Sequence, residues 1–145
     1  LFAATPPLEA IKVLISMAAS QRGVKKIRKL MFIDISKAYF HAPSRRPVYV
    51  RLPAEALEPG EMPNTLCGKL NYSLYGTRDA AQNWEEEYTA FLTDLGFTKG
   101  LSSPCLFRHS KRDTDVVVHG DDFTILGYDE DLRWLKDKFA NKFKN

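Results

Sequence analysis

Two short apolar runs near the end of the chain, Asp115–His119 and Phe123–Gly127, are separated only by the tripeptide Gly-Asp-Asp. Gly and Asp favour the backbone conformations of tight turns, so this pattern predicts a β-hairpin. A further apolar run over Cys105–His109 predicts a third strand just before it. The hairpin commits this half of the chain to an antiparallel sheet, which is the strongest constraint on its fold.

Local patterns predict the other elements, in the overall order helix, strand, strand, helix, strand, strand, strand, helix. Apolar residues three and four apart indicate helices, and short apolar or alternating runs indicate strands. The expected helices begin at Thr5, Asp79 and Asp129 and end near Ser20, at Gly96 and near Phe143, and the other strands cover Leu30–Ile35 and Pro47–Leu52. Asp79 with Gln82, and Asp129, are expected to cap their helices. The sequence therefore predicts an α+β domain, an antiparallel sheet with helices packed on one face.

The length of 145 residues fits one domain, and 44% hydrophobic with 27% charged residues is a globular composition. No apolar run approaches the roughly 18 residues of a membrane span, and no signal-peptide pattern is present, so we expect an intracellular protein with no membrane partner. Two cysteines are too few for a disulfide framework or a zinc site. The chain starts at Leu1 and stops without a helix-ending residue, which suggests a piece of a longer chain.

Basic residues concentrate in the first part of the chain, where residues 1–50 hold nine Lys and Arg against two acidic residues. Five of them crowd into eight positions: Arg22, Lys25, Lys26, Arg28 and Lys29. Such a density can neutralise the phosphates of a nucleic acid. A solvated loop between packed elements has the same composition, and charge alone favours the loop about two to one.

Three carboxylates occupy positions that packing alone does not explain. Asp34 lies inside an apolar strand, and Asp121 and Asp122 lie at the hairpin turn. A buried carboxylate costs several kcal/mol unless it is paired, hydrogen-bonded or bound to a metal. If the three converge, their repulsion favours a cation, and Mg²⁺ suits carboxylate ligands without clustered His or Cys. The alternative is an ordinary Gly-Asp turn, and Asp34 changes that balance only if its strand lies beside the hairpin.

The same segments resemble motifs of reverse transcriptases. Phe32–Phe40 is similar to the first catalytic motif of that family, and Val118–Phe123 to its paired-aspartate motif. Between them, Tyr72–Trp84 resembles the copia-type retrotransposon motif usually written SLYGLKQAPRAW. Leu1–Ala3 and Leu8–Ile11 resemble the lead-in helix of the family, and Val48–Pro53 resembles the strand after the first motif. Five short matching regions in the right order, over nearly the whole chain, are more specific than any one of them.

This resemblance implies a palm-type sheet with partial fingers, in a single partial reverse transcriptase domain that covers residues 1–145 and is truncated at both ends. The implied activity is that of an RNA-directed DNA polymerase, a nucleotidyltransferase that acts within a Pol polyprotein. Its partners would be an RNA template, a DNA primer, deoxynucleoside triphosphates and the rest of the polyprotein. The implied location is a cytoplasmic particle.

The resemblance also implies roles for individual residues. Asp34 and Asp121 would hold two Mg²⁺ ions, with Mn²⁺ as an alternative metal, and Asp122 would support them as the third catalytic carboxylate. The backbone carbonyl of Ile35 would be a further metal ligand. The incoming nucleotide would contact Lys37, Ala38, Tyr39, Gly76 and Arg78. The Tyr39 ring would clash with a ribose 2′-hydroxyl, which favours deoxynucleotides, and Trp84 is assigned to the core.

Several features depart from the pattern of the family. His119-Gly120 replaces an aromatic or aliphatic pair and predicts looser positioning of the primer end, and Asp79 adds a charge beside the triphosphate path unless it caps the helix. The basic fingers segment and the thumb lie outside the sequence, so the chain alone is predicted to have no polymerase activity. Two other hypotheses are a degenerate remnant that binds nucleic acid weakly through Arg22–Lys29, and a Mg²⁺-dependent phosphohydrolase that uses the three aspartates.

Overall fold

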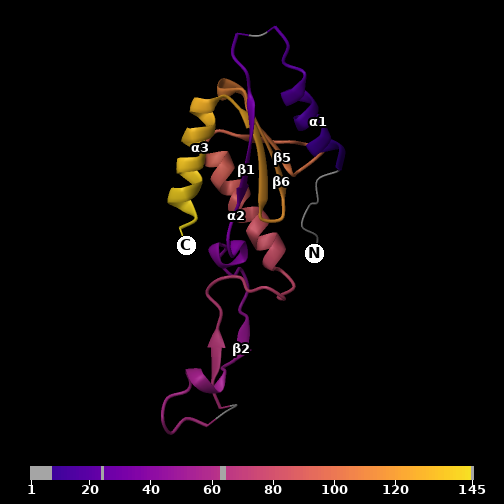
Figure 1. The fold of residues 1–145 in the computed structure, drawn as a ribbon. Coiled ribbons are helices and arrows are strands. Elements are labelled where there is room, and N and C mark those ends of the chain that lie inside the picture. Colours follow the sequence, from indigo (N-terminus) through magenta and orange to yellow (C-terminus); the bar gives the residue numbers. More distant parts are fainter. Residues whose placement is uncertain (1–7, 24, 63–64, 145) are drawn as a thin grey trace.

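The computed structural model describes residues 8–23, 25–62 and 65–144, so the predicted helix start at Thr5 lies outside the described residues. The helices are α1 (Leu8–Ala19), α2 (Ala80–Asp94) and α3 (Asp129–Lys142), and the strands are β1 (Lys29–Asp34), β2 (Tyr49–Arg51), β3 (Cys67–Lys69), β4 (Thr98–Lys99), β5 (Leu106–His109), β6 (Thr114–His119) and β7 (Asp122–Gly127). In Figure 1 the sheet lies between α1 and α3. Across these described ranges, no helix combines the length and apolarity that a membrane crossing requires.

Five strands form one antiparallel sheet in the order β1-β7-β6-β5-β4. The predicted hairpin is confirmed as β6 and β7, with His119 opposite Asp122 next to the turn. β1 lies at the edge of the sheet and pairs with β7 along its whole length, from Lys29 opposite Gly127 to Asp34 opposite Asp122. The antiparallel α+β class is therefore confirmed, and the strand that carries Asp34 does lie beside the hairpin.

Helices cover both faces of the sheet, so the prediction that they pack on one face is wrong. α2 and α3 pack on one face, in a cluster that includes Trp84. α1 packs on the other face, where Leu14 is buried. β6 explains this arrangement, because Val116 and Val118 belong to the first cluster and Val117 belongs to the second. A strand whose central residues are all apolar, like Val116–Val118, needs cover on both sides.

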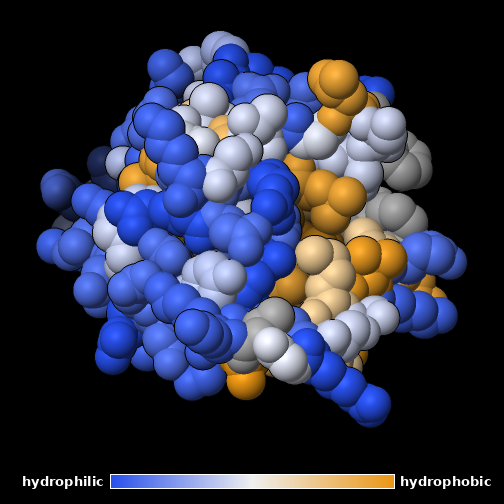
Figure 2. All heavy atoms as spheres, turned by 90° about the horizontal axis from the view of Figure 1, so that it is seen from above, coloured by the Kyte–Doolittle hydropathy of each residue, from blue (hydrophilic) through white to orange (hydrophobic). Residues whose placement is uncertain are grey.

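α1 is apolar on its outer side as well. Val13, Ile15 and Met17 remain exposed, whereas Leu14 is 4% exposed. Seen from above in Figure 2, apolar side chains gather on the side of the molecule that carries α1, and hydrophilic residues cover the opposite side. The helix therefore contacts the sheet through a narrow stripe.

β2 and β3 form a separate two-stranded ribbon that projects away from the main sheet (Figure 1). The strand predicted over Pro47–Leu52 is confirmed at Tyr49–Arg51, but its partner β3 was not predicted. Gly68 of β3 packs closely on the chain opposite: a Cβ at this position would lie 2.9 Å from Cδ2 of Leu52, the end of a flexible side chain that would have to shift.

Asp79 occupies the N-cap position of α2, as predicted, but the side-chain capping bonds predicted for Asp79 and Asp129 are wrong. The Asp79 carboxylate accepts a hydrogen bond from Arg46 (2.9 Å) and makes no side-chain cap at the start of α2. This bond lowers the pKa of Asp79, so the added charge is balanced within the chain. Asp129 is the first residue of α3 and pairs with Lys29 (2.7 Å). In both cases a cation distant in sequence competes successfully with the backbone N–H groups that a cap would satisfy. The end of the central helix at Gly96, with φ +95°, is as predicted.

Candidate functional site

Pairing of β1 with β7 brings the predicted carboxylates together. Asp34 and Asp122 are Cα partners at the end of the ladder, a relation that places Cα atoms roughly 5 Å apart. The backbone N–H of Ile35 donates to the carbonyl of Asp121 (3.1 Å), which extends the pairing into the hairpin turn. Residues separated by most of the chain are therefore neighbours, as the proposed metal site requires.

Asp34 and Asp122 point to the same face of the sheet. Directly opposed residues in an antiparallel pair share a face, and both carboxylates are exposed. Together with His119 they line a hollow of about 340 Å³ at the end of the sheet. The two carboxylates carry like charges and repel each other, and a cation bound between them would offset this repulsion.

Asp121 lies at the turn, close enough to Tyr39 for its charge to act there. Burial raises the pKa of the Tyr39 hydroxyl, and the neighbouring Tyr75 and Asp121 raise it further. The structure thus brings all three predicted carboxylates to one end of the sheet, with Asp122 rather than Asp121 directly opposite Asp34. Their assigned catalytic roles stay predictions.

In this conformation the side chains of the three predicted aspartates do not converge on one point. Within residues 8–23, 25–62 and 65–144, no group of three His, Cys, Asp or Glu side chains is arranged to hold a metal ion. The donor chemistry fits a hard divalent cation, because Asp34, Asp121 and Asp122 offer carboxylate oxygens and two of them sit on directly paired strands. Backbone placement and donor type therefore suit Mg²⁺, and rotation of the side chains would have to bring the oxygens together.

The segments predicted to bind the nucleotide also meet. Lys37 immediately precedes a short 3₁₀ helix. The φ of Lys37 is +54°, a left-handed conformation that is unusual for a Lys, and the next residue, Ala38, is fully buried. The Tyr39 ring stacks on Tyr75 with centroids 4.4 Å apart, which joins the first motif to the segment before Gly76. In the sequence, the two joined segments begin at Ile35, whose carbonyl is a predicted metal ligand, and end at Arg78, whose side chain is exposed.

Gly76 leaves open space beside this joined region. Its φ is +88°, and a Cβ there would meet no atom within 4 Å. The positive φ accounts for the glycine, and the absence of a side chain also leaves the backbone open to close approach of a ligand. This geometry accords with the predicted contact between Gly76 and the incoming nucleotide, which stays a prediction.

One contact to the hairpin was missed by reasoning from sequence. Trp84 is 1% exposed, as its assignment to the core requires, and its indole Nε1–H donates to the backbone carbonyl of Gly120 (2.8 Å). A buried Trp usually finds a partner for its N–H, so the residue type was a signal that a polar contact existed. The position of the partner could not be read from the sequence.

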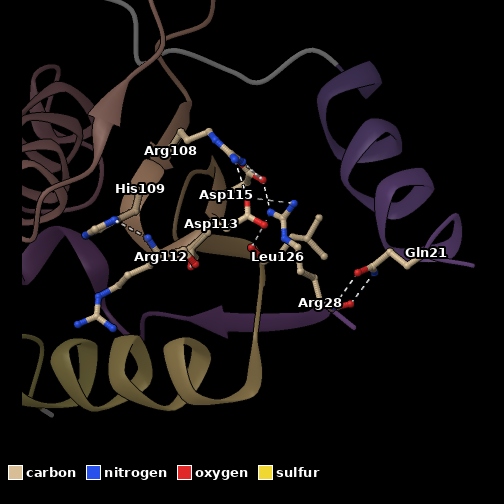
Figure 3. A network of polar contacts seen from close by, with 9 residues as sticks. Gln21, Arg28, Arg108, His109, Arg112, Asp113, Asp115 and Leu126 are labelled. Carbon is tan, nitrogen blue, oxygen red and sulfur yellow. Dashed lines mark hydrogen bonds and ion pairs between the residues drawn. The ribbon is translucent and has the colours of Figure 1, made fainter. Parts of the chain in front are cut away.

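The basic segment is partly committed to contacts within the chain. Arg28 donates to Asp115 and to the carbonyl of Leu126, and its side chain is only 11% exposed. Figure 3 shows Arg28 directed at Asp115, which also accepts from Arg108. Gln21 accepts a hydrogen bond from the Arg28 N–H (2.6 Å) and fixes the loop that precedes β1. Arg28 is thus placed as a structural link between β1 and β6.

The other four cations of the segment are exposed. Lys26 pairs with Glu130 (2.5 Å) and Lys29 with Asp129 (2.7 Å), so acidic residues of α3 offset their charges. Arg22 and Lys25 form no ion pair with the part of the chain that the structure describes. Exposed ion pairs contribute little to stability, so the phosphates of a nucleic acid could replace Glu130 and Asp129 as partners of these lysines. Nucleic-acid binding by this segment stays a prediction.

Comparison with known proteins places these features in a family. The family model described as "Reverse transcriptase (RNA-dependent DNA polymerase)" matches residues 1–145. The chain is also similar to the Retrovirus-related Pol polyprotein from transposon TNT 1-94 of Nicotiana tabacum, with 27% identity over 135 residues. That match covers 91% of this chain and 10% of the polyprotein, so the chain spans about a tenth of the length of this curated relative. No solved structure matches the chain.

Proposed function

The chain belongs to the reverse transcriptase family, and from this premise we propose that it forms the catalytic part of an RNA-directed DNA polymerase within a longer Pol polyprotein. The observation that carries the proposal is the register of β1 against β7. It sets Asp34 opposite Asp122, next to Asp121 and within reach of the segment that contains Tyr39. The carboxylates proposed to bind metal and the aromatic residue proposed to contact the nucleotide thus lie at the same end of the sheet.

Divalent cations, Mg²⁺ or Mn²⁺, would activate the primer hydroxyl and stabilise the leaving pyrophosphate when bound. Asp34, Asp121 and Asp122 would hold them, with the carbonyl of Ile35 as a further ligand. The chain contributes rigid placement: β1 is fixed by ladder bonds to β7, and the Ile35 N–H holds the turn. Such placement lowers the cost of bringing several negative groups around one ion.

Tyr39 is proposed to select deoxynucleotides. Its ring is fixed by stacking on Tyr75, so it cannot move aside without losing that contact. A sugar above the ring would have no room for a 2′-hydroxyl. Lys37 and Arg78 are proposed to contact the triphosphate, and the backbone at Ala38 and Gly76 to line its path.

The proposal is tested by DNA synthesis on an RNA template, with the longer protein encoded by the reading frame that contains this chain. Wild type is expected to extend a DNA primer with deoxynucleotides. Tyr39→Ala is expected to reduce discrimination against ribonucleotides roughly 10- to 100-fold, because the clash is removed, and Tyr39→Phe should retain discrimination because it keeps the ring. The measurement is the ratio of kcat/KM for deoxynucleotides and ribonucleotides.

Absence of RNA-templated synthesis by the longer protein would contradict the proposal. An encoding frame interrupted by stop codons would instead support a degenerate remnant. Hydrolysis of a phosphate ester by the 145-residue chain alone would favour the phosphohydrolase hypothesis.

A further inference from the structure

We propose that Trp84 is a positioning residue for the aspartate hairpin: its indole N–H holds the Gly120 carbonyl and so fixes the place from which Asp121 and Asp122 project. This inference rests on the proposed function for its catalytic meaning. The contact itself links α2 to the turn between β6 and β7. Residues 36 positions apart in the chain are joined by one hydrogen bond of 2.8 Å.

The Trp84 ring is itself held firmly. It packs edge-on against Tyr88, Phe123 and Phe143, with centroid distances of 5.6, 6.3 and 5.2 Å. These contacts surround an indole that is 1% exposed, so rotation of the ring would break several of them at once. The direction of the N–H is therefore set by the core.

The hairpin turn has little of its own to hold it. Gly120 has φ +64° and is exposed, and a Cβ added there would meet no atom within 4 Å, so no neighbouring atoms pack against this position. A glycine in such a place has wide conformational freedom. Beyond the strand ladder, the described contacts that restrain the turn are the bond from Trp84 to the Gly120 carbonyl and the bond from Ile35 to the Asp121 carbonyl.

These two bonds act on successive carbonyls from different elements. α2 restrains the residue before the aspartates, and the residue after β1 restrains the first aspartate. The hairpin is thus tethered through its backbone carbonyls rather than through packing at Gly120. The tether needs no side chain at residue 120.

α2 also holds the segment around Gly76 and the β6–β7 hairpin at a fixed separation. α2 begins at Ala80, four residues after Gly76, and Trp84 lies one turn further along. A single rigid helix therefore connects the segment proposed to contact the nucleotide with the hairpin proposed to hold metal. Loss of the Trp84 bond should loosen the hairpin without unfolding that helix.

The test uses Trp84→Phe in the 145-residue chain, with Trp134→Phe as the matched control. Trp84→Phe removes the N–H and keeps an aromatic ring, whereas Trp134 stacks on Arg112 (3.9 Å) and makes no described contact to the hairpin. Amide hydrogen exchange at residues 119–122 is expected to accelerate roughly tenfold in Trp84→Phe only. Exchange in α1, which packs on the other face of the sheet in a separate cluster, should stay unchanged in both variants, which separates local loosening from general destabilisation.

A second readout is the dissociation constant for Mn²⁺, which is expected to rise about three- to tenfold in Trp84→Phe and not in the control. If Trp84→Phe does not fold, replacement of Trp84 by 3-benzothienylalanine, which exchanges the N–H for sulfur at nearly the same ring size, provides the same comparison. Hairpin exchange within twofold of wild type would overturn the inference. Faster hairpin exchange in a chain whose wild type binds no Mn²⁺ would uphold the tether and count against the proposed function.

Discussion

Asp34→Asn is expected to lower RNA-templated DNA synthesis by the longer protein at least roughly 100-fold, because a metal-binding carboxylate supplies several kcal/mol of transition-state stabilisation. The same substitution should slightly raise stability. Asp34 and Asp122 are exposed like charges directly opposite each other, and removal of one relieves a repulsion of a few tenths of a kcal/mol. Loss of activity with a gain in stability is the signature of a residue retained for function.

Asp94→Asn is the matched control for this experiment. Asp94 is exposed at the C-terminal end of α2, where a negative charge opposes the helix dipole, so the same chemical change there should leave activity unchanged and raise stability by a few tenths of a kcal/mol, as in Asp34→Asn. Activity would be measured as primer extension and stability as the free energy of unfolding in urea. A variant Asp34→Asn that retains full activity, or one that loses activity because it unfolds, would contradict the role assigned to Asp34.

The largest expected effect on stability follows from removal of Asp115. Its carboxylate accepts from Arg28 and Arg108, and the Arg28 side chain is 11% exposed. The Arg28 Nε atom is buried without a hydrogen-bond partner, so this guanidinium already depends on few contacts. Asp115→Ala leaves this buried cation with only the longer ion pair to Asp113 (3.7 Å) and should cost about 3 kcal/mol, or roughly 10 °C in Tm.

The effect reaches the candidate site through the register of β1. Arg28 immediately precedes β1 and also donates to the Leu126 carbonyl of β7 (3.3 Å), so it helps to align the two strands. A slip of one residue would turn Asp34 to the opposite face of the sheet. Asp115→Ala should therefore weaken Mn²⁺ binding as well as stability, although Asp115 lies at the other end of the sheet.

Two further variants make this prediction specific. Lys26→Met breaks an exposed pair with Glu130 and should produce no measurable change in unfolding. The double variant Arg28→Met, Asp115→Leu replaces the buried pair by apolar side chains and should recover most of the lost stability. If Asp115→Ala unfolds at the same urea concentration as Lys26→Met, the pair is not the structural link described above.

Local sequence patterns predicted the elements whose apolar residues face a core. The hairpin, β1 and the central helix fall in this class, and Val116-Val117-Val118 also held an unused signal that both sheet faces are covered. β3 and β4 were missed because strands of three and two residues carry almost no periodicity. The caps at Asp79 and Asp129 failed because Arg46 and Lys29 approach from distant parts of the chain, which no local pattern reports.

For the candidate site, the residues could be predicted from the sequence, whereas their arrangement required the structure. The positions of Asp34, Asp121 and Asp122 in an apolar strand and a turn singled them out, and the resemblance assigned their roles. The family match confirms the recognition of a retrotransposon-type reverse transcriptase. The pairing of Asp34 with Asp122 depends on strand order and register, which are properties of the whole sheet. The bond from Trp84 to Gly120 depends on where α2 packs, so it too required the structure.

The most direct test of the central claim, that β1 and the hairpin together form one cation site, is an NMR titration of the 145-residue chain with Mn²⁺. Paramagnetic broadening is expected to remove the amide signals of residues 33–35 and 119–122 together, at the same low Mn²⁺ concentration, and to spare β4 and β5. The double variant Asp34→Asn, Asp121→Asn should lose this effect at both segments. Broadening of only one segment, or equal broadening in wild type and the double variant, would contradict the claim.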